Sequence, residues 1–436
     1  MSGDGVRQPS LNNEISPGMN GETNRGGELS QADSKRPRHR GRWLNRTVLG
    51  IGLASLFSDW AHEIATTLLP AFLATMGVAA AWLGIIEGVS DGLASFAKMA
   101  PGFYTDRLTR RKPIAIIGYI GTALGTASFA VATSAWHVLF ARSFAWLGRG
   151  VRTPIRKALL AGSVSKETYG RAFGFERMMD TLGAIVGPAS AFLLLPIVHH
   201  HYPTLFALTL IPGLLATGLI AFVVKEKERK PVAHISFGES LRALPPRFRK
   251  FLFAVGLFGA GDFAHTLLIL LAVQKLTPTL GAAKAAGVAT GLYVLHNVLY
   301  ATFSMVAGWL ADRSNKGRLL AVGYFVAALM AVAVIFLPMN VWTLAIIFIV
   351  GGIYVAMEET LEDSFCAELV GEEHHGMAFG TLATVNGIGD FLSSIVVGAL
   401  WSAFGTQTAF AYSAVLFVAG SCLILRTTTR TESSTG

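Results

Sequence analysis

Acidic and imidazole side chains recur at helical spacing inside strongly apolar stretches of this chain. Asp59, His62 and Glu63 stand at positions i, i+3 and i+4, which places them on one face of a helix. Asp262 and His265 repeat the first part of this pattern. Carboxylates and imidazoles at bilayer depth are common parts of proton relays. We therefore expect proton coupling at these residues. The alternatives are a divalent metal bound by Asp59, His62, Asp262 and His265, or a hydrogen-bonded contact between helices.

A second charged group lies in the next apolar stretch. Asp91 and Lys98 follow Glu87 by four and eleven residues, so helical geometry returns all three close to one face. Glu87 and Asp91 are therefore candidates for the wall of a cavity. Because Lys98 supplies a cation on the same face, the alternative is that the three side chains neutralise one another.

Two stretches of opposite charge stand 206 residues apart. The first is basic and contains Arg142, Arg149, Arg152, Arg156 and Lys157. The second is acidic and contains Glu358, Glu359, Glu362 and Asp363. We expect Arg156 and Lys157 to face the acidic set and to form a breakable gate, because Coulomb attraction in a low dielectric is offset by desolvation. The alternatives are that Arg149 and Arg152 bind an anionic substrate, or that Arg156 and Lys157 extend to the membrane surface.

Apolar stretches long enough to cross a bilayer make up most of the chain. Its 436 residues are 52% hydrophobic and 14% charged, with a mean hydropathy of +0.51, whereas a soluble protein carries about 25% charged residues. A membrane-spanning helix needs about 20 apolar residues. This criterion predicts twelve spans, at 47–73, 80–104, 113–133, 137–160, 172–198, 205–224, 251–274, 285–311, 318–337, 341–366, 378–404 and 408–425. The chain is therefore expected to be an all-α membrane protein.

Three segments are too polar to span a membrane. Residues 1–46 are expected to form a disordered tail, residues 225–250 a charged linker that contains prolines, and residues 427–436 a second tail. These segments and the basic turns fall on one side of the predicted topology, and the opposite side carries Lys275 and Lys284. The positive-inside rule then places both termini and the linker in the cytoplasm, in a multi-pass protein of the plasma (inner) membrane. The net charge of +9 is carried by loops between apolar spans, which favours a membrane over nucleic acid as its partner.

A basic turn occurs twice. The first copy runs from Gly102 through Asp106, Arg107 and Arg110 to Arg111. A weaker copy begins 206 residues later and contains Gly308, Asp312 and Arg313. The segments that begin with Gly170 and Gly376 have the same offset. A register held across two separated motifs indicates one unit repeated twice.

From residue 47 to residue 425 the chain resembles the major facilitator superfamily. It keeps Gly102, Asp106, Arg107, Arg110 and Arg111 of that family's G-x-x-x-D-R-x-G-R-R/K turn, with Thr109 where the family often has glycine. The resemblance implies two pseudo-symmetric six-helix bundles, at 47–224 and 251–426, that rock about a central site. It also implies that Asp106 lies at the start of the eleventh span and latches the two halves in the outward-facing state.

The fifth span carries a helix-bend motif. Gly183, Gly187 and Pro188 follow Arg177 and Asp180, and they resemble the G-x-x-x-G-P motif that the family's exporters carry. Glycines four residues apart allow close helix approach, and proline bends a helix. The motif therefore favours export.

Nucleotide-binding and hydrolase motifs are absent from the sequence, so we expect no enzyme and no bound cofactor. We expect a monomer that moves a small solute through the lipid bilayer by alternating access, with protons as coupling ion, and we prefer efflux by antiport. The alternatives are uptake of a divalent metal or an organic anion, with the metal as substrate, and a receptor or scaffold with a transporter fold that no longer cycles. Retention of intramembrane charges in both halves argues against the scaffold.

Overall fold

The computed structural model describes residues 42–78, 80–228, 236–263 and 265–429. Within these ranges all regular secondary structure is helical, which confirms the predicted all-α class. The predicted tail at 1–46 lies outside the described residues up to position 41, as does the C-terminal tail from position 430. Segment 229–235 of the predicted linker is outside them as well.

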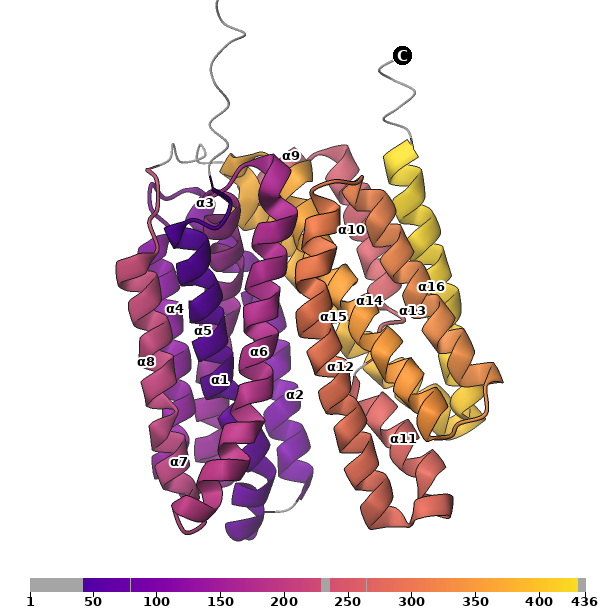
Figure 1. Cartoon of the computed structure of the whole chain (residues 1–436). Helices are drawn as coiled ribbons and strands as arrows, with labels where there is room; N and C mark the ends of the chain where they lie inside the picture. Colours follow the sequence, from indigo (N-terminus) through magenta and orange to yellow (C-terminus); the bar gives the residue numbers. More distant parts are fainter. Residues whose placement is uncertain (1–41, 79, 229–235, 264, 430–436) are drawn as a thin grey trace, which may run out of the picture. The chain divides into compact units, whose positions relative to one another are not determined.

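The first six passes form what we call the N-terminal half (Figure 1). The first pass begins where Asn45 accepts hydrogen bonds from the backbone N–H groups of Thr47 and Val48, which caps the helix. The passes are α1 (Arg46–Thr75), α2 (Ala80–Ala97) with α3 (Met99–Asp106), α4 (Lys112–Ala127), α5 (Ala135–Ala161), α6 (Tyr169–Ile197), and α7 (Tyr202–Leu208) with α8 (Leu210–Gly218). Short 3-10 and π turns extend the third and sixth passes, at Ser128–Val131 and Leu219–Val223.

The remaining helices form the C-terminal half. They are α10 (Pro246–Gly259), α11 (His265–Leu280), α12 (Ala282–Ala311), α13 (Lys316–Phe336), α14 (Val341–Leu369), α15 (His375–Phe404) and α16 (Thr406–Thr429). The linker, predicted as a charged segment that contains prolines, includes a short helix, α9 (Phe237–Ala243), which begins with a Ser236–Glu239 capping box. The predicted start of the seventh span at 251 was also late, because Pro246 already occupies the first turn of α10, where proline is favoured.

The seventh pass is broken, which corrects the prediction of one continuous span at 251–274. Helix α10 ends at Gly259 and α11 begins at His265. Side chains from other helices bind the freed backbone. Tyr412 donates its hydroxyl to the carbonyl of Ala260 at 3.1 Å, and Ser393 donates to the carbonyl of Asp262. Broken helices inside membranes are stable where their backbone groups find such partners, and they commonly form binding sites.

Eight helical stretches of the described residues are long and apolar enough to cross a membrane. The fourth pass, α5, does not meet that criterion because five basic side chains interrupt its apolar sequence. Large apolar side chains such as Phe192, Phe222 and Trp342 are strongly exposed, as expected for a surface that faces lipid. The fold is that of a multi-pass membrane protein.

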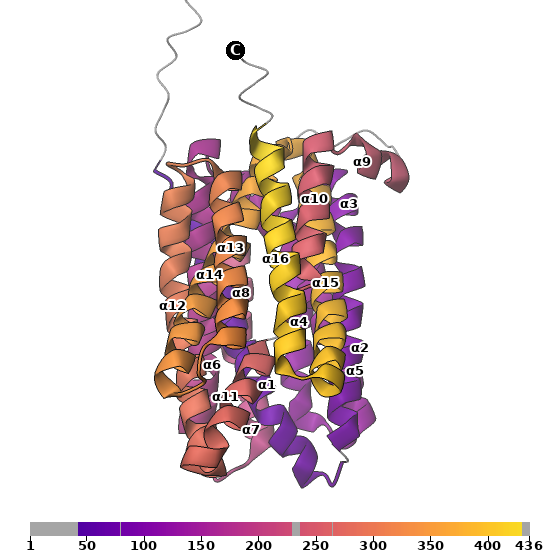
Figure 2. The same cartoon turned by 90° about the vertical axis from the view of Figure 1, so that its right-hand side faces the viewer.

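Successive passes run in alternating directions, so the loops gather at two ends (Figures 1 and 2). We call the end that carries loops 107–111, 162–168, 312–315 and 370–374 the basic end; α9 lies there too. The loops 76–78, 132–134, 198–201 and 337–340 lie at the opposite end. Lys275 and Lys284 lie toward that opposite end, as predicted.

The most extensive packing between the two halves involves four helix pairs. Helix α6 packs against α12 and α14, and α15 packs against α3 and α5. Glycines allow the closest approaches near the basic end. A Cβ atom on Gly102 would collide with the carbonyl oxygen of Gly376, and one on Gly170 would collide with the carbonyl oxygen of Gly308. The two contacts are equivalent under the 206-residue repeat.

Candidate functional site

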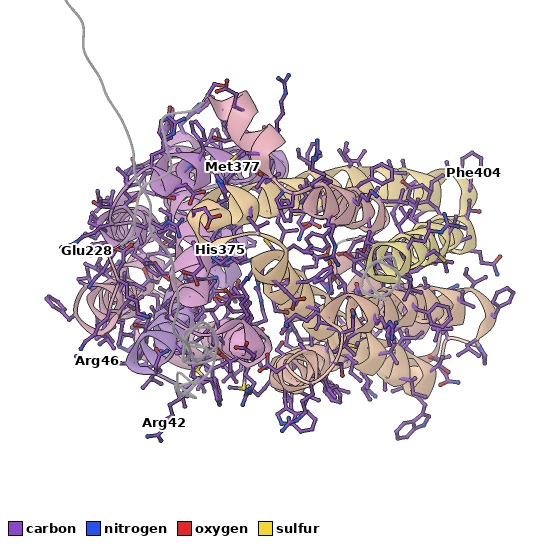
Figure 3. The ribbon with its side chains drawn as sticks, turned by 90° about the horizontal axis from the view of Figure 1, so that it is seen from above. Arg42, Arg46, Glu228, His375, Met377 and Phe404 are labelled. Atoms are coloured by element: carbon purple, nitrogen blue, oxygen red, sulfur yellow. The ribbon has the colours of Figure 1, made fainter. Side chains whose placement is uncertain are left out.

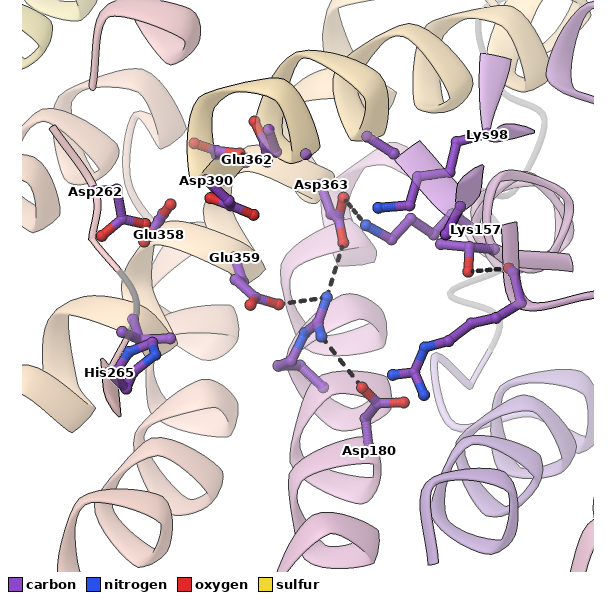
Figure 4. A pocket seen from close by; sticks show the side chains of 18 of the residues that line it. Lys98, Lys157, Asp180, Asp262, His265, Glu358, Glu359, Glu362, Asp363 and Asp390 are labelled. Atoms are coloured by element: carbon purple, nitrogen blue, oxygen red, sulfur yellow. Dashed lines mark hydrogen bonds and ion pairs between the residues drawn. The ribbon is translucent and has the colours of Figure 1, made fainter. Parts of the chain in front are cut away.

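A cavity of about 560 Å³ lies between the two halves (Figure 4). The N-terminal half contributes residues of α2, α5 and α6 to its wall, together with Lys98 from the turn between α2 and α3. The C-terminal half contributes the broken segment between α10 and α11 together with residues of α12, α14 and α15. The site is thus assembled from residues that are up to 300 positions apart in the sequence, at Ala94 and Ser394.

The wall from the N-terminal half is basic. Its six cations are Lys98, Arg149, Arg152, Arg156, Lys157 and Arg177. Arg149 and Arg152 are three residues apart on α5 and so share a face. Asp59, on the neighbouring helix α1, lies 3.0 Å from Arg149 and 4.0 Å from Arg152. This single carboxylate therefore holds two guanidinium groups at the cavity.

Arg152 is the least satisfied cation of this wall. Its side chain is 2% exposed, and its guanidinium stacks over the ring of Tyr119 at 4.3 Å. Its Nε and Nη1 atoms have no hydrogen-bond partner among the described residues. A buried guanidinium has five donors, and leaving them unpaired is costly. Because Arg152 also lines the cavity, an acceptor that enters next to it would give this guanidinium a partner.

The wall from the C-terminal half is acidic. Its carboxylates are Asp262, Glu358, Glu359, Glu362, Asp363 and Asp390. Asp262 lies in the broken segment and accepts a hydrogen bond from the hydroxyl of Tyr354 at 3.1 Å. Neither Asp262 nor Glu358 has a cationic partner in the part of the chain that the structure describes. Figure 4 shows both side chains together on the side of the cavity away from Lys98 and Lys157.

Ion pairs cross the cavity between the halves. Lys157 Nζ lies 2.7 Å from Asp363 Oδ1, and Arg177 Nη2 lies 2.5 Å from Glu359 Oε2. Arg177 is also 3.8 Å from Asp363 and 3.2 Å from Asp180. These pairs join α5 and α6 to α14, so separating the halves on this side must break them.

Asp106 and Asp312 each join the two halves at the basic end. Asp106 accepts hydrogen bonds from the backbone N–H groups of Gly376 and Met377, at 2.9 and 2.7 Å, and it pairs with Arg111. The structure thus places Asp106 at the start of the eleventh span, where the family resemblance located it. A carboxylate is stabilised there by the helix dipole. Figure 3, viewed from this end, shows the start of α15 at His375 and Met377 against the helices of the N-terminal half.

The first predicted relay residues lie behind the cavity wall. Asp59 contacts the cavity wall through Arg149 and Arg152, and the His62 ring packs 4.8 Å from the ring of Trp146, which lines the cavity. Glu63 packs against Gly187. We expect all three at the proton-coupling cavity, but none of them is among its lining residues; Asp59 and His62 instead contact Arg149 and Trp146 of α5, which do line it.

The charges predicted on the second span separate. Glu87 pairs with Arg142 of α5 at 2.7 Å, which removes it from the cavity wall. The side chain of Asp91 lies outside the described part of the chain. Lys98 stands at the turn between α2 and α3 and lines the cavity. Neutral pairing of Glu87 is therefore what the structure shows, but its partner is Arg142 rather than Lys98.

Only part of the predicted gate joins the halves. Lys157, Glu359 and Asp363 do so, but Arg156 does not. Arg156 pairs inside its own half with Glu176 at 2.8 Å and Asp180 at 3.3 Å, and it contacts Ser55. The reason is rotation about the helix axis, because adjacent residues on a helix point about 100° apart.

The remaining acidic gate residues also stay within their half. Glu362 accepts hydrogen bonds from Tyr324 at 2.5 Å and Asn386 at 2.7 Å, and Glu358 faces the cavity. Arg177 and Asp180, predicted as part of the helix-bend motif, instead belong to the ion-pair network of the cavity.

The three arginines of the basic turn, Arg107, Arg110 and Arg111, make different contacts. Arg111 supports Asp106, while Arg107 stacks over Phe103 at 4.0 Å. Arg110 is exposed and pairs with Glu228 of the linker at 2.5 Å, not with the other half. The hydrogen bond to Glu228 raises the pKa of Arg110 above its ordinary value. We expect this whole turn, Gly102, Asp106, Arg107, Arg110 and Arg111, to belong to the cytoplasmic gate, but neither Arg107 nor Arg110 forms an ion pair with the C-terminal bundle among the described residues.

Gly183 and Gly187 press α6 against α1. A Cβ atom on Gly183 would collide with the carbonyl of Leu56, and one on Gly187 would collide with the Glu63 side chain. Helix α6 continues through Pro188 to Ile197. These glycines therefore provide close packing within the N-terminal half.

Sequence reasoning missed several lining residues. Asp390 and Asn386 lie on α15, and the spacing of four that brings both to the cavity was visible in the sequence. His265 was predicted, but its neighbour His296, with ring centres 4.8 Å apart, was not. Helical periodicity relates residues within one span, so it cannot predict that His265 on α11 lies beside His296 on α12.

The metal candidates do not converge. Asp59 is paired with Arg149, His62 packs on Trp146, Asp262 is bonded by Tyr354, and His265 lies beside His296. Among the described residues no three His, Cys, Asp or Glu side chains are arranged to hold a metal ion.

A helical membrane protein with a charged cavity between two repeated halves, clasped at one end, defines a membrane transporter. The comparisons agree. The family model described as Major Facilitator Superfamily matches residues 51–276 and 251–436. The chain belongs to this superfamily, and it is a transporter rather than an enzyme.

Some relatives are similar to this chain over nearly its whole length, and others over one part of it. An uncharacterised MFS-type transporter of Methanocaldococcus jannaschii is 24% identical over 398 residues, covering 91% of this chain and 99% of the relative. The multidrug resistance protein MdtH of Salmonella paratyphi B is 28% identical over 109 residues, covering 24% of this chain and 27% of MdtH. The crystal structure of the MFS transporter FucP has a TM-score of 0.72 at 17% identity, covering 89% of this chain and 100% of FucP.

Proposed function

We propose that this chain is a proton-coupled antiporter that exports a small organic solute across the plasma (inner) membrane. The observation that carries the proposal is the pair of carboxylates without cationic partners, Asp262 and Glu358, at a cavity shared by the two halves. Carboxylates at this depth are costly unless they bind protons or substrate. Asp262 and Glu358 are therefore suited to exchange bound protons for bound substrate.

Mutual exclusion favours antiport over symport. A carboxylate that holds a proton cannot at the same time pair with a cationic group of a substrate. Arrival of substrate at Asp262 or Glu358 would therefore release protons, and protonation would release substrate. Coupling of this kind requires only that substrate binds better to the deprotonated carboxylates than to the protonated ones, so that each ligand lowers the affinity for the other.

The direction of transport is proposed from three features. The basic loops place the clasped end in the cytoplasm under the positive-inside rule, so the clasped state would be outward-facing. The Gly183–Pro188 segment resembles a motif of exporters, and part of the chain is related to a multidrug resistance protein. Release of an exported solute and uptake of protons would both occur in this state.

An organic solute fits the site better than a bare metal ion. The cavity of about 560 Å³ lies within the range of about 300–1,000 Å³ usual for organic ligands. The described residues also hold no metal-ligating cluster. Uptake of an organic anion is the second candidate, and it is favoured by the unpaired donors of Arg152.

The test measures protons directly. The full chain is reconstituted into liposomes that contain the pH dye pyranine, and compounds that stabilise the protein in a thermal-shift screen of metals, organic anions and cationic drugs are added outside. Antiport moves protons out as substrate enters, so the lumen becomes alkaline. Acidification would indicate symport, and a lumen pH that stays constant while labelled substrate enters would refute proton coupling. Empty liposomes supply the control for passive leakage.

A further inference from the structure

The cavity separates its charges by half. All six lining cations come from the N-terminal half, and six of the seven lining carboxylates come from the C-terminal half, with Asp180 as the exception. The cavity is therefore close to neutral as a whole but strongly dipolar across its width. Figure 4 shows this division between the side that holds Lys98 and Lys157 and the side that holds Asp262 and Glu358.

Part of this charge is already paired across the cavity. Lys157 binds Asp363, and Arg177 binds Glu359. What remains to bind a ligand is Arg152 on one wall, with Nε and Nη1 unpaired, and Asp262 with Glu358 on the other. Arg152 is almost fully buried, so water cannot readily replace a missing acceptor.

We propose that the transported solute is a zwitterion, whose anionic group binds Arg152 and whose cationic group binds Asp262 and Glu358. This inference rests on the proposed function and names the substrate class of the same site. A carboxylate or phosphate group can accept hydrogen bonds from a guanidinium in a bidentate manner. An ammonium group supplies the donors that the two free carboxylates lack.

Singly charged solutes fit the same cavity poorly. An anion bound at Arg152 leaves Asp262 and Glu358 unpaired and lies in their repulsive field. A cation bound at the carboxylates leaves the donors of Arg152 unpaired. Removing one partner of a buried charge pair is expensive because the other charge stays desolvated. A solute with both charges satisfies both walls and remains neutral overall, which reduces its own desolvation.

The test uses matched triads of probes on the full chain in detergent at a fixed neutral pH, without any gradient. Each triad contains an amino acid, the amine that lacks its carboxylate, and the acid that lacks its amine. One triad is L-phenylalanine, phenethylamine and 3-phenylpropionate. Another is 6-aminohexanoate, hexylamine and hexanoate. A series of ω-amino acids with four to eleven carbons varies the distance between the charges. Binding is measured by calorimetry and by thermal shift.

We expect at least one zwitterion to bind about tenfold or more tightly than both of its singly charged analogues. Arg152→Gln should reduce the preference over the amine, and Glu358→Gln should reduce the preference over the acid. This crossed pattern would not arise from a general loss of structure. If Arg152→Gln does not fold, the Glu358→Gln arm still tests the proposal. Arg313→Gln and Glu372→Gln, which alter exposed side chains outside the cavity, are the matched controls.

Three results would overturn the inference: a singly charged analogue that binds as tightly as its zwitterion in every triad, variants that leave both preferences unchanged, or no binding by any probe. These outcomes differ from failure of the proposed function. Zwitterion binding without any proton movement in liposomes would refute antiport and keep the substrate class. Proton exchange driven by a singly charged cation would support antiport and refute the zwitterionic substrate class.

Discussion

Asp106 and Asp312 stand 206 residues apart and make the same contact in opposite directions. Asp106 of the N-terminal half accepts hydrogen bonds from the backbone N–H groups at the start of α15. Asp312 of the C-terminal half accepts them from Gly170 and Arg171 at the start of α6, at 2.7 and 3.2 Å. The two clasps are related by the internal repeat, and together they hold the halves closed at the basic end.

Breaking one clasp should open this end. Asp106→Asn removes the charge from hydrogen bonds that are worth about 1.5–3 kcal/mol, so the open population should rise about tenfold or more. The native thiol of Cys366 reports the change. It is fully buried and stands three residues after Asp363, on the face of α14 that meets Lys157. Maleimide labelling in a Cys422→Ser background should therefore accelerate.

The same assay checks whether the clasps are equivalent. Asp312→Asn should accelerate labelling of Cys366 to a similar degree, and the double variant should exceed either single one. Arg313→Gln, adjacent to Asp312 but exposed, is the control and should label at the wild-type rate. Unchanged labelling in the double variant would mean that the clasps do not limit opening.

Close backbone contact at Gly102 is a second requirement for closure. Gly102→Ala would place a methyl group against the carbonyl of Gly376, and backbone cannot move aside as a side chain can. We expect faster labelling of Cys366 and a lower thermal stability of the closed state. Gly88→Ala, on the same pass but with open space around it, should behave as the wild type. Equal behaviour of the two variants would contradict the structure.

The pair of Lys157 and Asp363 should respond to charge exchange. Either Lys157→Asp or Asp363→Lys alone places two like charges at a contact of 2.7 Å, and breaking a buried pair costs about 3–5 kcal/mol. The double exchange restores opposite charges. A double-mutant cycle on transport rate or on Cys366 labelling should therefore show recovery in the double variant. Additive losses would show that the pair does not act as a unit.

Arg156 should behave differently from Lys157 although the two are adjacent. Its partners Ser55, Glu176 and Asp180 all lie in the N-terminal half, so Arg156→Met leaves buried carboxylates unpaired inside one bundle. We expect a stability loss of about 3–5 kcal/mol, seen as a lower unfolding temperature. Protein that remains folded at low temperature should keep the labelling rate of the wild type. Faster labelling without a stability loss would restore Arg156 to the gate.

Most of the architecture could be predicted from the internal repeat of the sequence. The 206-residue offset located Asp106 and Asp312 and aligned Lys157 with Asp363, because equivalent helices of two halves meet near the symmetry axis. The positions of the helical passes followed from the apolar stretches of the sequence, although only eight helical stretches of the described residues are long and apolar enough to cross a membrane. What length did not reveal is the break in the seventh pass between Gly259 and His265, since the side chains that bind its freed backbone, Tyr412 and Ser393, are distant in the chain.

The cavity was harder to predict than the helices. Spacing on a helix says which residues share a face but not which face meets the other half, so Arg156 and Lys157 were assigned the same role. Side-chain size decided the position of Asp59, since Arg149 lies between it and the cavity. Arg177 was grouped with Gly183 by proximity in sequence, although its partner Glu359 is 182 residues away.

Proton release from the cavity carboxylates is the central claim, and the lumenal pH of pyranine-loaded proteoliposomes tests it most directly. On addition of a stabilising substrate, wild-type protein should make the lumen alkaline. Asp262→Asn should bind the substrate more weakly, through Arg152 and Glu358, and should abolish the pH change even at saturating substrate, whereas Glu372→Gln, exposed outside the cavity, should retain it. An undiminished pH change in Asp262→Asn combined with Glu358→Gln would contradict the account.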